Sequence, residues 1–387
     1  MADVEIGIGK SARLAYGLED VSIVPSRRTR DPEDVDISWQ LDAFGFPLPL
    51  MAGPLDAVVS PRSAVAVGRL GGLAALNLEG LWTRYEDPAP LLEEIVSLPA
   101  ESVTARLQAL YAEPVRPELV TARIREIGES GVVTCAAVSP QRADALVPAA
   151  LEADLDVLVV QGTVVSAEHV SKGSEPLNLK RFIREIDIPV VVGGCVSYQA
   201  ALHLMRTGAV GVLAGVGSGE ACTTRGVLGL GVPQATAIAD AAGARTRHLE
   251  ETGVYVHVIA EGGMEQGGDV AKAIACGADA VMLGAPLAGT EDAPGRGAFW
   301  GSHAGHGSLP RGTRIATPPI GTLEDVLLGP SRRDDGRLNL FGALRTTMAM
   351  CGYASLREFH KAEVVVSPAI RTEGKRLQRA QSVGLGR

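Results

Sequence analysis

Residues 215–225 combine the residue types that a covalent catalyst needs. A run of apolar residues ending at Ala214 leads into a glycine-rich turn, and the turn ends at Cys222, which two threonines follow. Glycines let the backbone adopt conformations closed to other residues and bring bare N–H and C=O groups close to a ligand or an ion. A thiol at the edge of such a turn is a nucleophile when its pKa and its neighbours permit it. Two interpretations follow: a nucleophilic Cys222, or a buried structural cysteine beside an ordinary turn.

Composition indicates a compact α/β protein with a large core. Of the 387 residues, 46% are hydrophobic and only 4% are aromatic, so the packing must depend on Ala, Val, Leu and Ile. The formal net charge of −9 creates no field that attracts nucleic acid or an anionic membrane, and we expect neither as a partner. Anionic ligands must therefore be held by local groups.

The cysteines and the N-terminus favour a cytoplasmic protein. The five cysteines are widely spaced and show no metal-ligand spacing, which fits free thiols in a reducing compartment. The N-terminal residues lack the apolar segment of a signal peptide. No apolar run approaches the roughly 20 residues that span a bilayer.

Short apolar runs recur along the chain, with helical spacing between most of them. Repeated strand–helix units with continuous Val, Ile and Leu strands predict a parallel sheet covered on both faces. Eight such units favour a closed (β/α)8 TIM barrel over an open doubly wound sheet. A barrel requires the functional residues to follow the strands, and the Cys222 turn does so. The eight runs are 49–52, 73–76, 132–138, 157–160, 189–192, 210–214, 255–260 and 280–283.

Two stretches depart from a plain barrel within what we interpret as one catalytic domain, residues 1–387. Residues 80–130 are rich in Glu, Arg, Leu and Ala and predict a helical insertion after the second strand, on the surface. Residues 285–340 are rich in Gly, Pro and charge and follow the eighth strand. So long an irregular stretch beside the active face predicts a flap over the site, with helical spacing resuming at Leu340.

Glycine turns after the seventh and eighth predicted strands indicate a phosphate site. Glu261 is followed by Gly262 and Gly263, and the last strand is followed by Gly284 and Ala285. Barrels hold phosphates at this place with backbone N–H groups and a helix N-terminus. An ordinary tight turn is the alternative for each pair taken alone. Together with a reactive thiol, the two turns predict a phosphorylated substrate whose reacting carbon lies over the sulfur.

The chain resembles the inosine monophosphate dehydrogenase/GMP reductase family over nearly its whole length. The family's regulatory CBS pair, normally inserted after the second strand, is absent, and residues 80–130 take its place. The resemblance is greatest to a compact actinobacterial subgroup described as IMP-dehydrogenase-related, through residues 76–88 and 165–171. The family phrases are residues 16–25, 71–73, 217–225, 267–295 and 341–359.

What the resemblance implies is chemistry at purine C2. The thiolate of Cys222 attacks C2, hydride moves between C2 and NAD or NADP, and a covalent thioimidate is then opened. Thr224 matches the threonine that positions the leaving group or water. The resemblance further implies a purine nucleotide substrate and a homotetramer. Its implied binding residues are Gly53, Leu55, Glu220, Glu261, Gly262, Gly263, Gly284, Ala285, Gly301 and Ser302 for the substrate, Gln161, Gly162, Thr163, Gly215 and Gly217 for the cofactor, and the carbonyls of Gly217, Gly219 and Cys222 for potassium.

Several positions depart from the family pattern. The ribose-binding Asp is Glu261, the phosphate-binding Ser is Glu220, the Asp that contacts the nicotinamide ribose is Gln161, and the Asn after the fifth strand is Cys195. A carboxylate and a phosphate repel each other when both are buried and ionised. The repulsion is several kcal/mol, to an order of magnitude about 1–4 kcal/mol. Neither the Arg–Tyr pair of the dehydrogenase flap nor the reductase Glu is found, and residues 303–305 occupy the place of the latter.

The direction of reaction follows from these features only in part. The short flap and the missing CBS pair favour reduction of GMP to IMP by NADPH over oxidation of IMP to XMP by NAD. His303, His306 and Arg311 are the candidates to supply a proton from the flap, or else solvated loop residues. Two further alternatives remain, both motivated by Glu220: a weakly active nucleotide-binding regulator, and an enzyme for a modified or unphosphorylated purine nucleoside.

Overall fold

Eight parallel strands close into a barrel. The computed structural model describes residues 3–172, 176–367 and 372–384. Each strand pairs with its neighbour in sequence, and the last pairs with the first, through Val281 opposite Leu50. The predicted (β/α)8 barrel is therefore confirmed, and each of the eight predicted runs coincides with one strand. The strands are β6 (Leu50–Ala52), β7 (Leu73–Asn77), β8 (Cys135–Val138), β9 (Val157–Gln161), β10 (Val190–Cys195), β11 (Gly211–Ala214), β12 (His257–Glu261) and β13 (Ala280–Leu283).

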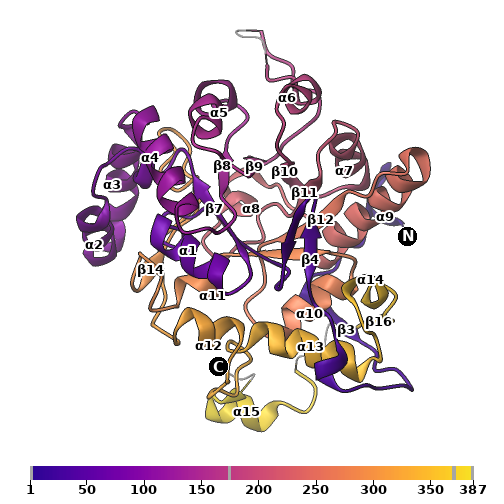
Figure 1. Ribbon diagram of the computed structural model, residues 1–387. Coiled ribbons are helices and arrows are strands. Elements are labelled where there is room, and N and C mark those ends of the chain that lie inside the picture. The colour runs from indigo at the N-terminus through magenta and orange to yellow at the C-terminus, as the bar shows by residue number, and fades with distance from the viewer. Residues whose placement is uncertain (1–2, 173–175, 368–371, 385–387) are drawn as a thin grey trace.

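Helices surround the barrel on its outside (Figure 1). Capping side chains fix the starts of some of these helices: Ser60 accepts a hydrogen bond from the Ser63 N–H at the start of α1, and Ser197 accepts one from the Ala200 N–H at the start of α7. The helices that follow the strands are α1 (Pro61–Arg69), α4 (Pro117–Gly128), α5 (Ala143–Leu151), α6 (Leu179–Glu185), α7 (Tyr198–Met205), α8 (Thr224–Leu228), α9 (Gln234–Thr252) and α10 (Gly267–Ala275).

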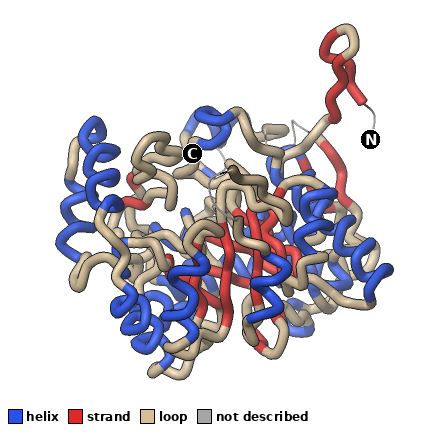
Figure 2. The backbone as a smooth tube through the Cα atoms, turned by 90° about the horizontal axis from the view of Figure 1, so that it is seen from above, coloured by secondary structure: helices blue, strands red, loops and turns tan. Residues whose placement is uncertain are grey.

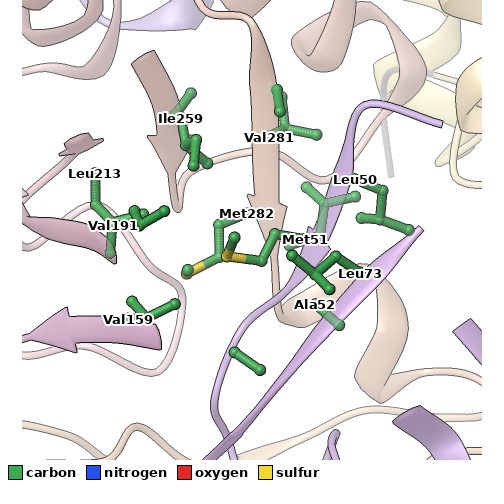
Figure 3. Close-up of a cluster of buried hydrophobic side chains, with 14 of the residues drawn as sticks. Leu50, Met51, Ala52, Leu73, Val159, Val191, Leu213, Ile259, Val281 and Met282 are labelled. Carbon is green, nitrogen blue, oxygen red and sulfur yellow. The ribbon is translucent and has the colours of Figure 1, made fainter. Parts of the chain in front are cut away.

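Apolar side chains fill the barrel interior. Leu50, Val159, Val191, Leu213 and Ile259, from five different strands, belong to one cluster and are each under 1% exposed (Figure 3). A barrel filled in this way is a packed core and not a pore. Ligand chemistry is therefore confined to the loops at the ends of the strands.

The stretch between β7 and β8 contains the predicted helices. η3 (Leu81–Thr83), α2 (Ala89–Ser97) and α3 (Ala100–Ala112) precede α4. Because α4 packs against α1 and α5, it is the helix that covers this part of the barrel. The additional helices are α2 and α3, which lie together at one side of the barrel (Figure 1). We call residues 80–113 the helical insertion.

The stretch after β13 is mostly irregular and contains a few short elements. β14 (Ala298–Phe299) pairs antiparallel with β15 (Ile315–Ala316) and closes residues 298–316 into a loop. This loop is part of the predicted flap segment 285–340, and from here on it alone is called the flap. Helix α13 (Leu340–Met350) begins where helical spacing was predicted to resume. The remaining elements of this stretch are α11 (Ala285–Ala288) and α12 (Leu323–Leu327).

The terminal segments pack at the other side of the barrel or project from it. β3 (Val21–Ile23) pairs antiparallel with β16 (Val364–Val366), which joins a segment near the start of the chain to one near its end. The hairpin of β1 (Asp3–Gly7) and β2 (Lys10–Arg13) extends away from the barrel (Figure 2). Within the described residues, no helix combines the length and the apolar character that crossing a membrane requires. The other elements are η1 (Leu18–Asp20), η2 (Pro32–Asp34), β4 (Trp39–Leu41), β5 (Phe44–Phe46), α14 (Leu356–Phe359) and α15 (Arg376–Gln381).

Candidate active site

A cavity of about 820 Å³ lies at the carboxyl ends of the barrel strands. Its volume is typical of sites for small molecules and cofactors. The loops after β6, β7, β8, β9, β11, β12 and β13 all contribute to its lining, together with the flap. The structure brings every predicted site residue into this lining. These are Gly53, Leu55, Gln161, Gly162, Thr163, Gly215, Gly217, Gly219, Glu220, Cys222, Thr224, Glu261, Gly262, Gly263, Gly284, Ala285, Gly301 and Ser302.

Cys222 is the one described cysteine that lines this cavity. It is partly exposed, and its Sγ lies 3.1 Å from the Oγ1 of Thr224, which is buried at the start of α8. Burial raises the pKa of the Cys195 thiol to about 12 and that of Cys276 to about 11, so these two thiols stay protonated. A structural cysteine would be expected to lie in the core, and the position of Cys222 favours the nucleophile.

The flap lies directly on the cysteine turn. The Thr223 N–H donates to the Arg311 carbonyl at 3.3 Å, and the Thr313 N–H donates to the Ala221 carbonyl at 2.9 Å. Cys222 and Gly312 thereby form a short antiparallel bridge. The thiol is therefore held between the end of β11 and the flap.

Two flap side chains meet Thr163 above the cavity. The Nε2 of His303 lies 3.3 Å from the Thr163 Oγ1, and the Arg311 Nη2 donates to the same oxygen at 3.3 Å. Burial, and then the charge of Arg311, lower the pKa of His303 to about 4. Its imidazole is thus neutral near pH 7 and has no proton to spare for a leaving group.

Glu261 forms part of the cavity lining with Gln161. The Gln161 Nε2 donates to the Glu261 Oε1 at 2.6 Å. Burial raises the pKa of Glu261 to about 7, against the opposing effect of the hydrogen bond from Gln161. The resemblance assigned these two residues to different ligands, and the structure places them in contact. This carboxyl therefore lies where the expected substrate and cofactor sites meet.

The titration of Glu261 predicts a pH-dependent stability. Since its folded pKa is raised above the unfolded value, folding favours the protonated form, and this stabilisation is lost as the pH rises through about 7. We expect the free energy of unfolding of the wild type to fall relative to that of Glu261→Gln by about 1–2 kcal/mol between about pH 5 and about pH 8. Urea unfolding of both proteins across this range measures the difference. Parallel pH profiles would show that Glu261 does not titrate there.

Two left-handed glycines let the turn after β12 pack under the cysteine turn. Gly262 and Gly263 have φ angles of +80° and +77°, which L side chains rarely adopt. A Cβ on Gly262 would lie 2.7 Å from the Ser218 Oγ, which itself donates to the Glu261 carbonyl at 2.7 Å. The predicted phosphate turn and the cysteine turn therefore interlock.

Glu220 lies between this cavity and a second one. The second cavity, of about 580 Å³, shares Ser218, Glu220 and Gly263 with the first. The Glu220 carboxyl is within hydrogen-bonding reach of the Glu265 carboxyl, and partial burial and then Glu265 raise its pKa. Arg337 donates to the Glu265 Oε2 at 2.7 Å. Glu220 is thus part of a Glu–Glu–Arg group beside the predicted phosphate site.

Sequence reasoning missed the contribution of the helical insertion. Arg84 and Tyr111, from its two ends, line the large cavity, as does Arg142 after β8. The amphipathic pattern of the insertion indicated only a helix on the surface, and no motif singled these residues out. Their side chains meet the cavity because the insertion folds back over the carboxyl ends of the strands.

The structure gives limited support for a potassium site. The Gly219 carbonyl, one of the three expected ligands, already accepts a hydrogen bond from the Cys222 N–H at 3.0 Å. A potassium ion bound there would share this oxygen with the Cys222 N–H.

Comparisons with known proteins agree with this architecture. Residues 15–312 match the model of the IMP dehydrogenase/GMP reductase domain. An uncharacterized oxidoreductase of Mycolicibacterium smegmatis is 53% identical over 372 residues, covering 94% of this chain and 99% of its own length. The inosine-5′-monophosphate dehydrogenase of Methanocaldococcus jannaschii is 26% identical, covering 94% of this chain and 95% of its own.

A solved structure extends the similarity to the whole fold. The IMP dehydrogenase/GMP reductase-like protein of Corynebacterium glutamicum superimposes with a TM-score of 0.90 at 46% identity, covering 94% of this chain and 98% of that chain. The domain match spans well over half of the residues. The barrel, the cysteine turn and these relatives together place the chain in the IMP dehydrogenase/GMP reductase family of oxidoreductases.

Proposed function

We propose that the protein is an oxidoreductase acting at C2 of a purine nucleotide, with Cys222 as the nucleophile. The observation that carries the proposal is the position of the thiol, which lines the cavity beside Thr224 and beneath the flap. Addition of the thiolate forms a C–S bond at C2. Breaking that bond later returns the free thiol, with oxygen from water replacing sulfur in the oxidative direction.

The cavity also has room for a nicotinamide cofactor. NAD or NADP, when bound, supplies the acceptor or donor of the hydride at C2. Residues 161–163, Gly215 and Gly217 would hold it, since they line the same cavity as Cys222. Arg84 and Arg142 line this cavity too and offer positive charge to the phosphates of a dinucleotide.

The flap contains His303, the side chain that could give or accept a proton in the reaction. Reduction of GMP, which the short flap and the missing CBS pair favoured, requires a proton for the departing ammonia. The neutral His303 has none to give near pH 7. Oxidation of IMP instead requires a group that accepts a proton from the water that opens the thioimidate. A pKa of about 4 also makes the neutral imidazole beside Thr163 a weak base near pH 7, so His303 favours neither direction, and reduction of GMP stays the first candidate, with oxidation of IMP to XMP as the second.

One set of titrations separates the candidates. GMP, IMP, XMP, guanosine and inosine are each incubated with the oxidised and the reduced forms of NAD and NADP, and the absorbance of the reduced nicotinamide is followed. Formation of reduced NAD with IMP supports oxidation, and consumption of NADPH with GMP supports reduction. Turnover with a nucleoside alone would assign an unphosphorylated substrate. Binding of nucleotides without any turnover would favour the regulator.

The remaining expectations from the resemblance are part of the same proposal. We propose a homotetramer, which light scattering of the purified protein tests. A cytoplasmic location fits the described cysteines, all of which are free thiols. Comparing the rate in potassium with the rate in sodium at equal ionic strength tests the cation.

A further inference from the structure

The helical insertion contacts the flap at three separate points. The Trp300 Nε1, near the start of the flap, donates to the Tyr111 Oη at 2.9 Å. In the middle, the Gln108 Nε2 donates to the His306 carbonyl at 3.0 Å and to the Gly307 carbonyl at 3.3 Å. The two partners on the insertion lie one turn apart on α3.

The third contact lies at the end of the flap. Arg314 places one guanidinium nitrogen against the C-terminal end of α2, where a helix leaves carbonyl groups unpaired. That nitrogen donates to the carbonyls of Ile95, Val96 and Leu98. Between the three contacts lie Ser302, His303 and Arg311, which line the cavity.

Tyr111 is itself fixed from the barrel side. Its hydroxyl donates to the carboxylate of Asp56, which follows β6 and is only 2% exposed. Gly80 makes this possible, because a Cβ there would lie 2.0 Å from the Asp56 Oδ1. Burial and then the charge of Asp56 hold the pKa of Tyr111 well above its usual range, so the phenol keeps the proton that it donates.

The flap also packs tightly on the ring of Tyr111. A Cβ on Gly305 would lie 2.6 Å from the ring, so the flap backbone passes directly over it. Trp300 is 1% exposed, so its indole N–H donates to the Tyr111 hydroxyl and not to solvent. Asp56, Tyr111 and Trp300 thus form a continuous chain from the barrel to the flap.

From these contacts we infer that the helical insertion positions the flap over Cys222, and that Tyr111 is the positioning residue for the segment 300–305. The inference rests on the proposed function only in assigning Gly301 and Ser302 of this segment to the purine base. The insertion is then a working part of the active site. The residues that contact the purine base then lie on a loop that α3 holds in position.

Tyr111→Phe tests the inference, with Tyr85→Phe as the matched control. Both changes remove one phenol hydroxyl in the insertion, but the Tyr85 hydroxyl donates to the Leu110 carbonyl at 3.1 Å, within the insertion itself. We expect trypsin to cleave after Arg311 or Arg314 about tenfold faster in Tyr111→Phe, since the buried Trp300 N–H loses its acceptor and the open population of the flap increases. Tyr85→Phe should match the wild type. This measurement needs no substrate.

Turnover provides the second measurement. We expect the KM for the purine nucleotide to rise about tenfold in Tyr111→Phe with a smaller change in kcat, because the base-contacting segment is displaced while Cys222 is not. Gln108→Ala should change both measurements in the same direction, and its partly exposed side chain makes it a safeguard if Tyr111→Phe fails to fold. Flap cleavage in Tyr111→Phe and Gln108→Ala at the rate of Tyr85→Phe and the wild type would overturn the inference. Faster flap cleavage without turnover of any purine by the wild type would leave the positioning role intact and reject the proposed function.

Discussion

Cys222→Ala is expected to abolish turnover, with kcat falling by about 10⁴-fold or more, as for nucleophiles in other covalent enzymes. Without the sulfur no bond to C2 forms, and hydride transfer loses the intermediate through which it proceeds. The cavity is otherwise unchanged, so the Kd for the nucleotide should change by less than about threefold. Steady-state rates and titration calorimetry measure the two quantities.

A covalent adduct provides the direct readout. Wild-type protein quenched in acid during turnover should carry the mass of the purine nucleotide on the peptide that contains Cys222. Cys276→Ala serves as the control, because Cys276 lies at the end of α10 and does not line the cavity. Full activity in Cys222→Ala, or an adduct on another cysteine, would reject the proposed mechanism.

The barrel could be predicted because its signals are local. Each strand is a short run of mostly apolar residues, most of them have a glycine directly at or after their end, and the phrase around Cys276, Gly277 and Ala278 marks the point where a helix ends and β13 begins. The residues that follow strands meet at one end of any closed parallel barrel. Once eight strands were counted, the convergence of the Cys222 turn and the Gly262 turn followed from topology.

The contacts between the insertion, the flap and the barrel loops could not be predicted because they are long-range, although the two segments themselves were predicted. Tyr111 meets Trp300 across 189 positions of the chain, and Gln161 meets Glu261 across 100. Neither pair has a spacing that periodicity detects, and each depends on how two loops of the same face pack. For the same reason, the lowered pKa of His303 follows from the burial of its side chain in the folded flap and from the charge of Arg311, and not from the motif in which it stands.

Glu220 is the residue through which we propose that the site selects its substrate. Its carboxyl lies in the lining of both cavities, next to the turn predicted to bind phosphate. An ionised carboxylate there repels a phosphate dianion, and in a partly hydrated cleft each such pair costs about 1–3 kcal/mol. The contact with Glu265 counteracts this repulsion, because the raised pKa of Glu220 keeps more of it in the neutral form.

Glu220→Ser is expected to tighten binding of a purine monophosphate by about tenfold to a hundredfold at alkaline pH, where the ionised fraction of the wild-type carboxyl is largest. As the pH falls, the wild-type carboxyl takes up a proton and the repulsion weakens. The difference between the two proteins should therefore shrink, even though the phosphate itself also titrates, because both proteins bind the same phosphate. Titration calorimetry with IMP or GMP at several pH values measures this difference.

Two controls separate the charge at this position from general effects. Glu19→Ser removes a carboxylate that lines only the second cavity, so it should change nucleotide affinity much less. Binding of inosine or guanosine should be the same in Glu220→Ser and the wild type, because neither ligand carries a phosphate. If the wild type instead binds the nucleoside more tightly than its monophosphate, and Glu220→Ser reverses that order, then Glu220 selects against phosphate and the natural substrate is a purine nucleoside. Glu220 is the strongest objection to a nucleotide substrate, and its replacement by Ser therefore distinguishes a nucleotide substrate from a nucleoside.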